Sequence, residues 1–169
     1  MGIDPGVAST GFGVVRVAGA SMSAIDGGVI EAPSNESLEQ RLALIHRELE
    51  QLISWHDPVA VALEDLYFGK NVRSAIAVGQ ARGVVMLAAA QHDVPCFDYT
   101  PQAVKMAVCG SGAADKGQVQ QMVGALLHLP KPPESDHAAD ALAVAICHAG
   151  HAQATPALAG ASTARATAG

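Results

Sequence analysis

Four side chains that could bind a metal ion lie at the ends of predicted elements: Asp4, Glu64, His137 and Asp140. Asp4 closes a short apolar strand near the start of the sequence. Glu64 follows the apolar run at residues 59–63, which is typical of a strand buried in a parallel sheet. His137 and Asp140 are close enough in sequence to share one face of the last predicted helix. Oxygen ligands with one imidazole and no cysteine favour Mg²⁺ or Mn²⁺ over zinc.

Ions of this kind would allow the site to bind a phosphate group and catalyse its hydrolysis. Two divalent ions bound about 4 Å apart can polarise a phosphodiester, generate hydroxide from water and neutralise the leaving oxygen. In this hypothesis Asp4 bridges the two ions and Glu64 completes the first site. His137 and Asp140 complete the second. Lys116, near a predicted helix start, could stabilise negative charge in the transition state, with a solvated helix-terminal lysine as the alternative.

Each acid also has a structural interpretation. Asp4 could be a turn residue that preorganises the Pro-Gly bend after it, and Glu64 a partly solvated acid at a strand end. Either Ser135 or Asp136 is expected to cap the last helix. Asp136 is better explained by such a structural role than by catalysis, because an acid there accepts free N–H groups. Asp140 lies beyond the cap on a helix of Ala, Leu, Val and Ile. An unpaired carboxylate is costly on such a surface, so we expect it to bind a cation.

Composition indicates a single globular domain that stays in the cytoplasm. Half of the 169 residues are hydrophobic, and 4% are aromatic. The three cysteines are interpreted as reduced thiols without a zinc site. No apolar run approaches the roughly 20 residues that span a bilayer, so we expect a soluble protein with no membrane partner. The predicted domain covers residues 1–151, and residues 152–169 are predicted to be a disordered tail.

The net charge of −6 argues against a nucleic-acid partner, but its distribution is uneven. Residues 1–65 carry a net charge of −7, residues 66–131 carry +3 and residues 132–169 carry −2. A basic middle between acidic ends is what a phosphate-facing strip beside a metal-binding acid cluster would produce. Small counts could produce it by chance as well, and the charge alone does not decide.

Apolar periodicity predicts an α/β fold that begins with an antiparallel meander. The expected strands are residues 2–4, 10–17, 22–31, 59–63 and 94–99, and the expected helices are residues 38–55, 71–92, 101–108, 116–127 and 136–148. Along residues 71–92 we expect Ala75, Ile76, Val78, Val85 and Leu87 to face inward.

The first predicted strand is unusually short. Only Met1, Gly2 and Ile3 precede Asp4, whereas a central strand usually has about five or six residues. We therefore expect either a natural start upstream of Met1 or a short, frayed strand.

Several short motifs together resemble the RuvC family of bacterial Holliday-junction endonucleases. In chain order they are Gly2-Ile3-Asp4-Pro5-Gly6, Thr10-Gly11, Leu63-Glu64, Lys70-Asn71, Gly79-Gln80-Ala81-Arg82-Gly83, Lys116-Gly117-Gln118-Val119-Gln120 and His137-Ala138-Ala139-Asp140-Ala141-Leu142. The resemblance runs from Gly2 to about His148. It implies a ribonuclease-H-like fold, with a mixed five-stranded sheet flanked by helices, and a homodimer. It also implies magnesium-dependent symmetric nicking of four-way DNA junctions in partnership with RuvA and RuvB.

The resemblance also assigns roles to residues. Asp4, Glu64, His137 and Asp140 fall on the family's four catalytic positions, where two Mg²⁺ ions per subunit are expected and Mn²⁺ should substitute. The third position is often Asp and in some members His, so His137 is either a ligand or a proton shuttle. The expected DNA contacts are Tyr67, Phe68, Lys70, Arg73, Arg82 and Lys105. Lys105 and Lys116 fall on basic positions near the scissile phosphate, and Tyr67 falls where an aromatic stacks at the junction.

Two other functions remain open at this stage. One is a junction-binding module of the same fold without nuclease activity, which an Asp4→Asn variant that binds but does not cut would separate from an enzyme. The other is a small phosphotransferase-like ATP-binding domain, because a Gly-Ile-Asp-x-Gly opening also occurs in that superfamily. Failure to hydrolyse ATP with Mg²⁺ would argue against it.

Overall fold

The computed structural model describes residues 1–65 and 72–154. In chain order, these residues form β1 (Gly2–Asp4), β2 (Ser9–Ala18), β3 (Ser21–Glu31), α1 (Leu38–His56), β4 (Val61–Glu64), α2 (Val72–Gln91), β5 (Cys96–Tyr99), α3 (Pro101–Cys109), α4 (Lys116–Leu126) and α5 (Asp136–Ala154).

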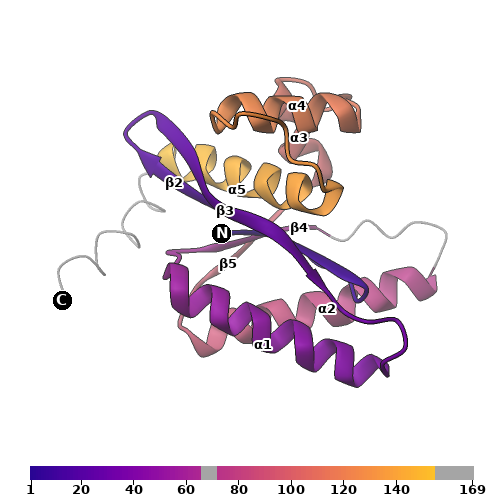
Figure 1. The fold of residues 1–169 in the computed structure, drawn as a ribbon. Helices are drawn as coiled ribbons and strands as arrows, with labels where there is room; N and C mark the ends of the chain where they lie inside the picture. The colour runs from indigo at the N-terminus through magenta and orange to yellow at the C-terminus, as the bar shows by residue number, and fades with distance from the viewer. Residues whose placement is uncertain (66–71, 155–169) are drawn as a thin grey trace.

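The strands form one mixed sheet in the order β3-β2-β1-β4-β5. β1 runs antiparallel to β2 and parallel to β4, and β4 runs parallel to β5. Helices α1 and α2 cover one face of the sheet, and α3, α4 and α5 lie on the other (Figure 1). The predicted mixed five-stranded sheet flanked by helices is confirmed.

Strand alternation sorts the side chains of β1 and β4 between the two faces. Ile3, Val61 and Leu63 belong to the apolar cluster beneath α1 and α2. Ala62 belongs to the cluster on the α5 side. Because successive side chains point to opposite faces, Asp4 and Glu64 lie on the α5 side as well.

Helix α5 lies almost directly on the backbone of β1 and β2. A Cβ atom at Gly2 would come within 2.0 Å of the Ala141 carbonyl oxygen. One at Gly11 would come within 2.0 Å of the His137 carbonyl oxygen. Real Cβ atoms do not approach so closely, so any side chain at these two positions would push the helix away from the sheet. The glycines therefore set the distance between α5 and the sheet.

The expectation of a frayed first strand is wrong. Ile3 is fully buried, and β1 is paired on both sides, by β2 and by β4. The parallel ladder continues one residue further, where the amide of Ala62 donates to the Met1 carbonyl at 2.8 Å. A strand with neighbours on both edges and a helix on each face is held in place despite its length.

Helix α2 differs from the prediction in the face that it buries. Ile76 and Leu87 were expected to face inward, but they are 58% and 52% exposed. Val85 is buried as predicted, and Ala81 and Ala88 are buried beside it. A helix with small apolar residues all around it has no clear amphipathic period, so its sequence does not define the inner face.

Helix α5 extends further than predicted. It ends at Ala154 instead of about His148, so its last residues lie in the segment predicted to be a disordered tail. Alanine is the strongest helix former, and the residues after His148 are rich in it. In the described part of the chain, no helix is both long and apolar enough to cross a bilayer.

The predicted DNA contact at Arg82 is not supported, because the structure buries this side chain. Arg82 is 8% exposed. One guanidinium nitrogen donates to the Glu64 carbonyl at 2.9 Å, and the other donates to the carboxylate of Asp98. Arg82 thus ties α2 to the ends of β4 and β5 through two hydrogen bonds inside the protein.

We expect Arg82→Met to lower the free energy of unfolding by about 2 kcal/mol, because a carbonyl and a carboxylate lose a charged donor. Urea denaturation measures the loss. Arg47→Met, at an exposed arginine of α1, is the control and should change stability by less than about 0.5 kcal/mol. Unchanged stability of the Arg82 variant would contradict the structural role.

Gly11→Ala should destabilise the protein by at least about 2 kcal/mol, because the new Cβ collides with the backbone of α5. The matched control is Gly150→Ala in α5, where a Cβ would meet nothing within 4 Å. That control should be neutral or stabilising by up to about 1 kcal/mol, since alanine favours a helix. Two equal midpoints in denaturation would show that α5 does not depend on the close approach.

Candidate active site

The structure brings the four predicted ligands to one end of the sheet. Register pairs Gly2 with Ala62, so Asp4 and Glu64 end neighbouring parallel strands and share a face. The first turns of α5 lie over the same place. There, His137 Nδ1 is 2.7 Å from the Asp4 carboxylate. Residues distant in sequence therefore meet where β1, β4 and α5 converge.

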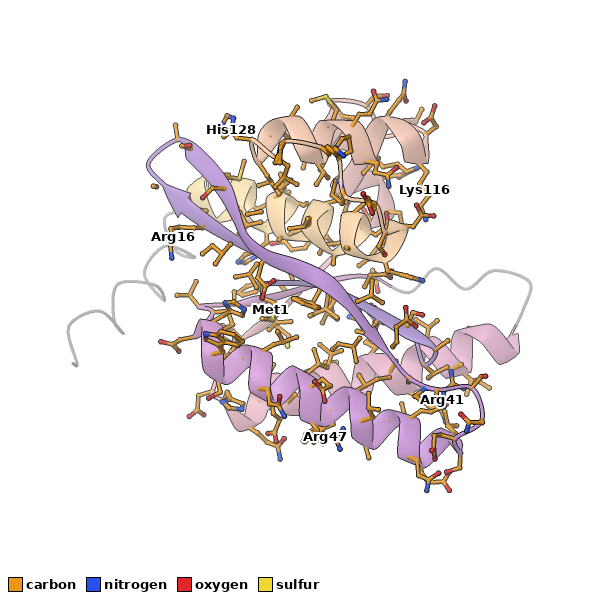
Figure 2. The ribbon with its side chains drawn as sticks, in the orientation of Figure 1. Met1, Arg16, Arg41, Arg47, Lys116 and His128 are labelled. Atoms are coloured by element: carbon orange, nitrogen blue, oxygen red, sulfur yellow. The ribbon has the colours of Figure 1, made fainter. Side chains whose placement is uncertain are left out.

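Two lysines approach these acids from the neighbouring helices. Lys116, the first residue of α4, places its Nζ 3.4 Å from Asp140 and 3.1 Å from Asp136. Its side chain projects from the helical layer of α3, α4 and α5 (Figure 2). Lys105 of α3 lines a cavity of about 240 Å³ together with Glu64, Asp140 and Lys116. Both lysines thus lie at the predicted site.

The carboxylates at this site repel one another. The pKa of Glu64 is raised by burial and then by the negative charges of Asp140 and Asp4. Burial also raises the pKa of Asp140, although Lys116 opposes the shift. Burial alone would lower the pKa of Lys116, but its contacts with Asp136 and Asp140 outweigh this effect and raise it. Such crowding favours the approach of further positive charge.

The ligand groups are engaged with other side chains. Asp4 contacts His137, and Asp140 contacts Lys116. Over residues 1–65 and 72–154, no three His, Cys, Asp or Glu side chains are grouped so that they could hold a metal ion as they stand. A cation that bound here would therefore compete with His137 for Asp4 and with Lys116 for Asp140.

Of the two predicted caps of α5, the structure supports Ser135 and not Asp136. The Ser135 carbonyl accepts from the Ala139 amide at 3.0 Å, and the Ser135 hydroxyl lies 3.5 Å from the Ala138 amide. Ser135 is therefore the N-cap residue, and Asp136 is the first residue of the helix. The side chain of Asp136 contacts Lys116 instead. Sequence reasoning missed this contact, because Lys116 and Asp136 meet only through the packing of α4 on α5.

The remaining predicted DNA contacts are only partly described. Tyr67, Phe68 and Lys70 lie outside the described residues. Arg73 falls in the first turn of α2, where the structure describes only the backbone. Lys105 is thus the one predicted DNA contact whose described side chain lies at the acid cluster.

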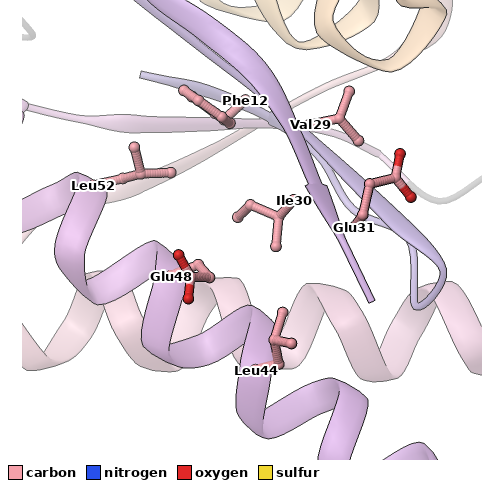
Figure 3. A pocket seen from close by; sticks show the side chains of 7 residues that line it. All are labelled: Phe12, Val29, Ile30, Glu31, Leu44, Glu48 and Leu52. Atoms are coloured by element: carbon pink, nitrogen blue, oxygen red, sulfur yellow. The ribbon is translucent and has the colours of Figure 1, made fainter. Parts of the chain in front are cut away.

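A different hollow lies on the opposite face of the sheet, between β3 and α1. Its volume is about 360 Å³, and its lining is Phe12, Val29, Ile30, Glu31, Leu44, Glu48 and Leu52 (Figure 3). None of the predicted site residues is among them. The predicted chemistry is thus confined to the α5 side of the sheet.

Comparison with known proteins agrees with this geometry. The family model of crossover junction endodeoxyribonuclease RuvC matches residues 1–148. The RuvC of Alkaliphilus oremlandii is 50% identical over 149 residues, which are 88% of this chain and 91% of the relative. The RuvC of Pelotomaculum thermopropionicum is 50% identical over 151 residues, or 89% of this chain and 92% of the relative.

Solved structures give the same result. Thermus thermophilus RuvC superposes with a TM-score of 0.84 at 37% identity, covering 90% of this chain and 94% of that one. T. thermophilus RuvC in complex with a Holliday junction substrate gives a TM-score of 0.87 at 38% identity, with coverages of 90% and 93%. The predicted ribonuclease-H-like fold is confirmed by this likeness. On its sequence and its structure, this chain belongs to the RuvC family of crossover junction endodeoxyribonucleases.

Proposed function

We propose that this chain resolves four-way DNA junctions by metal-dependent phosphodiester hydrolysis, as an endonuclease of recombination and repair. The observation that carries the proposal is the meeting of Asp4, Glu64 and Asp140 at one end of the sheet beside Lys116. A pure junction-binding module would have no use for partly buried carboxylates that repel each other. The intact acid set therefore favours the enzyme over the binding module and over an ATP-binding domain.

The donor set fits divalent metal ions. Three crowded carboxylates and one imidazole are hard, mostly oxygen ligands that suit Mg²⁺, with Mn²⁺ as a substitute. When bound, two such ions supply water activation and charge neutralisation at the phosphate. We assign Asp4, Glu64, His137 and Asp140 as the ligands, with two ions per subunit as part of the proposal.

The chain's own residues orient the reaction. Asp4 accepts from His137 Nδ1, and this contact fixes the ring and leaves Nε2 free. That nitrogen can either bind a cation or accept a proton, so both proposed roles of His137 are compatible with the contact. Lys116 and Lys105 supply positive charge on the side of the cavity opposite the strands and would stabilise the reacting phosphate.

The DNA contacts and the protein partners are proposed from the resemblance to the RuvC family. For the junction we keep Tyr67, Phe68, Lys70, Arg73 and Lys105 as proposed contacts, on the resemblance alone. On the same ground we propose a complex with RuvA and RuvB. We also propose a cytoplasmic location, where the DNA lies.

A homodimer is supported by the outer face of α2. Ile76, Met86 and Leu87 are 58%, 46% and 52% exposed there. A Cβ added at the neighbouring Gly83 would meet nothing within 4 Å. An exposed apolar helix face with a small residue suits close packing against a second copy of itself.

We expect Asp4→Asn, Glu64→Gln and Asp140→Asn each to lower the rate of junction cleavage at least about 100-fold, because each removes a charged ligand. Junction affinity should change less than about threefold, since DNA affinity depends mainly on cationic contacts. A gel of a labelled synthetic four-way junction, with and without Mg²⁺, measures cleavage, and a mobility-shift assay measures binding. Glu36→Gln, at an exposed acid before α1, is the control. Normal cutting by any of the three variants would remove that residue from the site.

The raised pKa of Glu64 predicts a pH-dependent effect on stability. When the pKa of a carboxyl is higher in the folded chain than in the unfolded chain, the protein loses stability as pH rises through the folded pKa. Without divalent ions, Glu64→Gln should therefore raise the Tm at pH 7 by about 2 °C. The difference should disappear below about pH 4, where the carboxyl is protonated in both states.

Calorimetry over this pH range, with Glu36→Gln as control, checks that prediction. Addition of Mg²⁺ should reverse the order of the two Tm values, because only the wild type keeps the ligand. A Glu64→Gln Tm that stays below that of the wild type without divalent ions would contradict the repulsion among the acids.

A further inference from the structure

Asp136 lies beside the proposed site without being one of its assigned ligands. We propose that it is a positioning residue that holds the Lys116 ammonium next to Asp140 and the reacting phosphate. This inference rests on the proposed nuclease function, and it gives a task to a carboxylate that does not cap its helix.

The contact geometry links the starts of two helices. Lys116 opens α4, whereas Asp136 and Asp140 lie one turn apart on the same face of α5. The ammonium of Lys116 lies between the two carboxylates, 3.1 Å from Asp136 and 3.4 Å from Asp140. These are the ion pairs of Lys116 within the part of the chain that the structure describes. Lys116 is therefore held from two points on one helix.

The pair between Lys116 and Asp136 contributes little to the fold. Their side chains are 56% and 59% exposed, and exposed ion pairs have small effects on stability. The N-cap role at the start of α5 belongs to Ser135. The carboxylate of Asp136 is thus free to act on the position of Lys116.

Positioning matters because Asp140 has a second task. A carboxylate that coordinates a cation offers less negative charge to a neighbouring ammonium, and lysine has a long, flexible side chain. Asp136 lies one helical turn before Asp140 and is the partner that keeps Lys116 in place when Asp140 binds a metal. His137, the next residue, points to Asp4 instead, so adjacent residues of α5 serve opposite sides of the site.

A double-mutant cycle tests whether Asp136 acts through Lys116. Single-turnover cleavage of a synthetic four-way junction is measured at saturating Mg²⁺ for wild type, Asp136→Asn, Lys116→Met and the double variant. Asp136→Asn should cut about tenfold more slowly, because the lysine loses its placement. Its junction affinity should change less than about twofold. In the Lys116→Met background the same change should have no further effect, and Asp136→Glu should restore most of the rate.

Glu134→Gln is the matched control, because it removes an exposed negative charge from the loop that leads into α5. It should cleave at the wild-type rate. A comparable loss in this control, or independent effects of Asp136→Asn and Lys116→Met in the cycle, would overturn the proposal in favour of a general effect of charge.

Two readouts do not depend on cleavage. Mn²⁺ binding followed by EPR should be within about twofold of wild type for Asp136→Asn but strongly weakened for Asp140→Asn. Equal weakening in both would make Asp136 a ligand instead. NMR relaxation of the Lys116 Cε, assigned with Lys116→Met, should show greater mobility in Asp136→Asn, and unchanged mobility would also overturn the proposal. If wild type fails to cut junctions with any divalent ion, the proposed function fails, and the NMR result still decides whether Asp136 holds Lys116.

Discussion

The direct contact between α5 and the backbone of the sheet is the constraint on which this structure depends. Gly2 and Gly11 leave no side chain between the strands and the helix, and carbonyl oxygens of α5 occupy the places where their Cβ atoms would be. A helix packed on ordinary side chains would lie several ångströms further from the strands. At that distance His137 could not reach Asp4. The glycines thus bring the first turn of α5 into contact with the carboxylate of β1.

The site combines features that each lower the stability of the folded protein and that a purely structural role would not require. Glu64 and Asp140 are partly buried with like charges nearby, and their pKa values rise as a result. The lysines that offset this repulsion come from α3 and α4, which pack mainly against α5 and each other. Acids carried by the sheet and by α5 thus face cations carried by the outer helices. This division leaves a cavity between the two sets, where a phosphate and its ions would find both charges.

Much of the fold could be predicted because it follows from local patterns. The strands and helices lie close to their predicted bounds, whereas the mixed five-stranded sheet was implied by the resemblance to the RuvC family. The errors arose where tertiary packing overrides local pattern. Ile76 and Leu87 are exposed because α2 has no marked apolar face, and Arg82 is buried because Asp98 and the end of β4 accept its donors. The first strand is short, but it is held in place because β2 and β4 pair with it on both edges. Its length alone does not reveal this pairing.

By itself, the sequence determined the residue types of the site and the elements that carry them. Strand alternation and helical periodicity reveal local features of this kind, such as an acid at the end of an apolar run or two polar residues on one helix face. Only the tertiary structure decided which of these groups touch. Aspartate is a residue type typical of helix caps, yet Asp136 pairs with Lys116. Ser135 caps the helix. The physical reason is that contacts between α4 and α5, or between α5 and β1, depend on packing distances set by glycines and alanines far apart in the chain, and no local pattern records those distances.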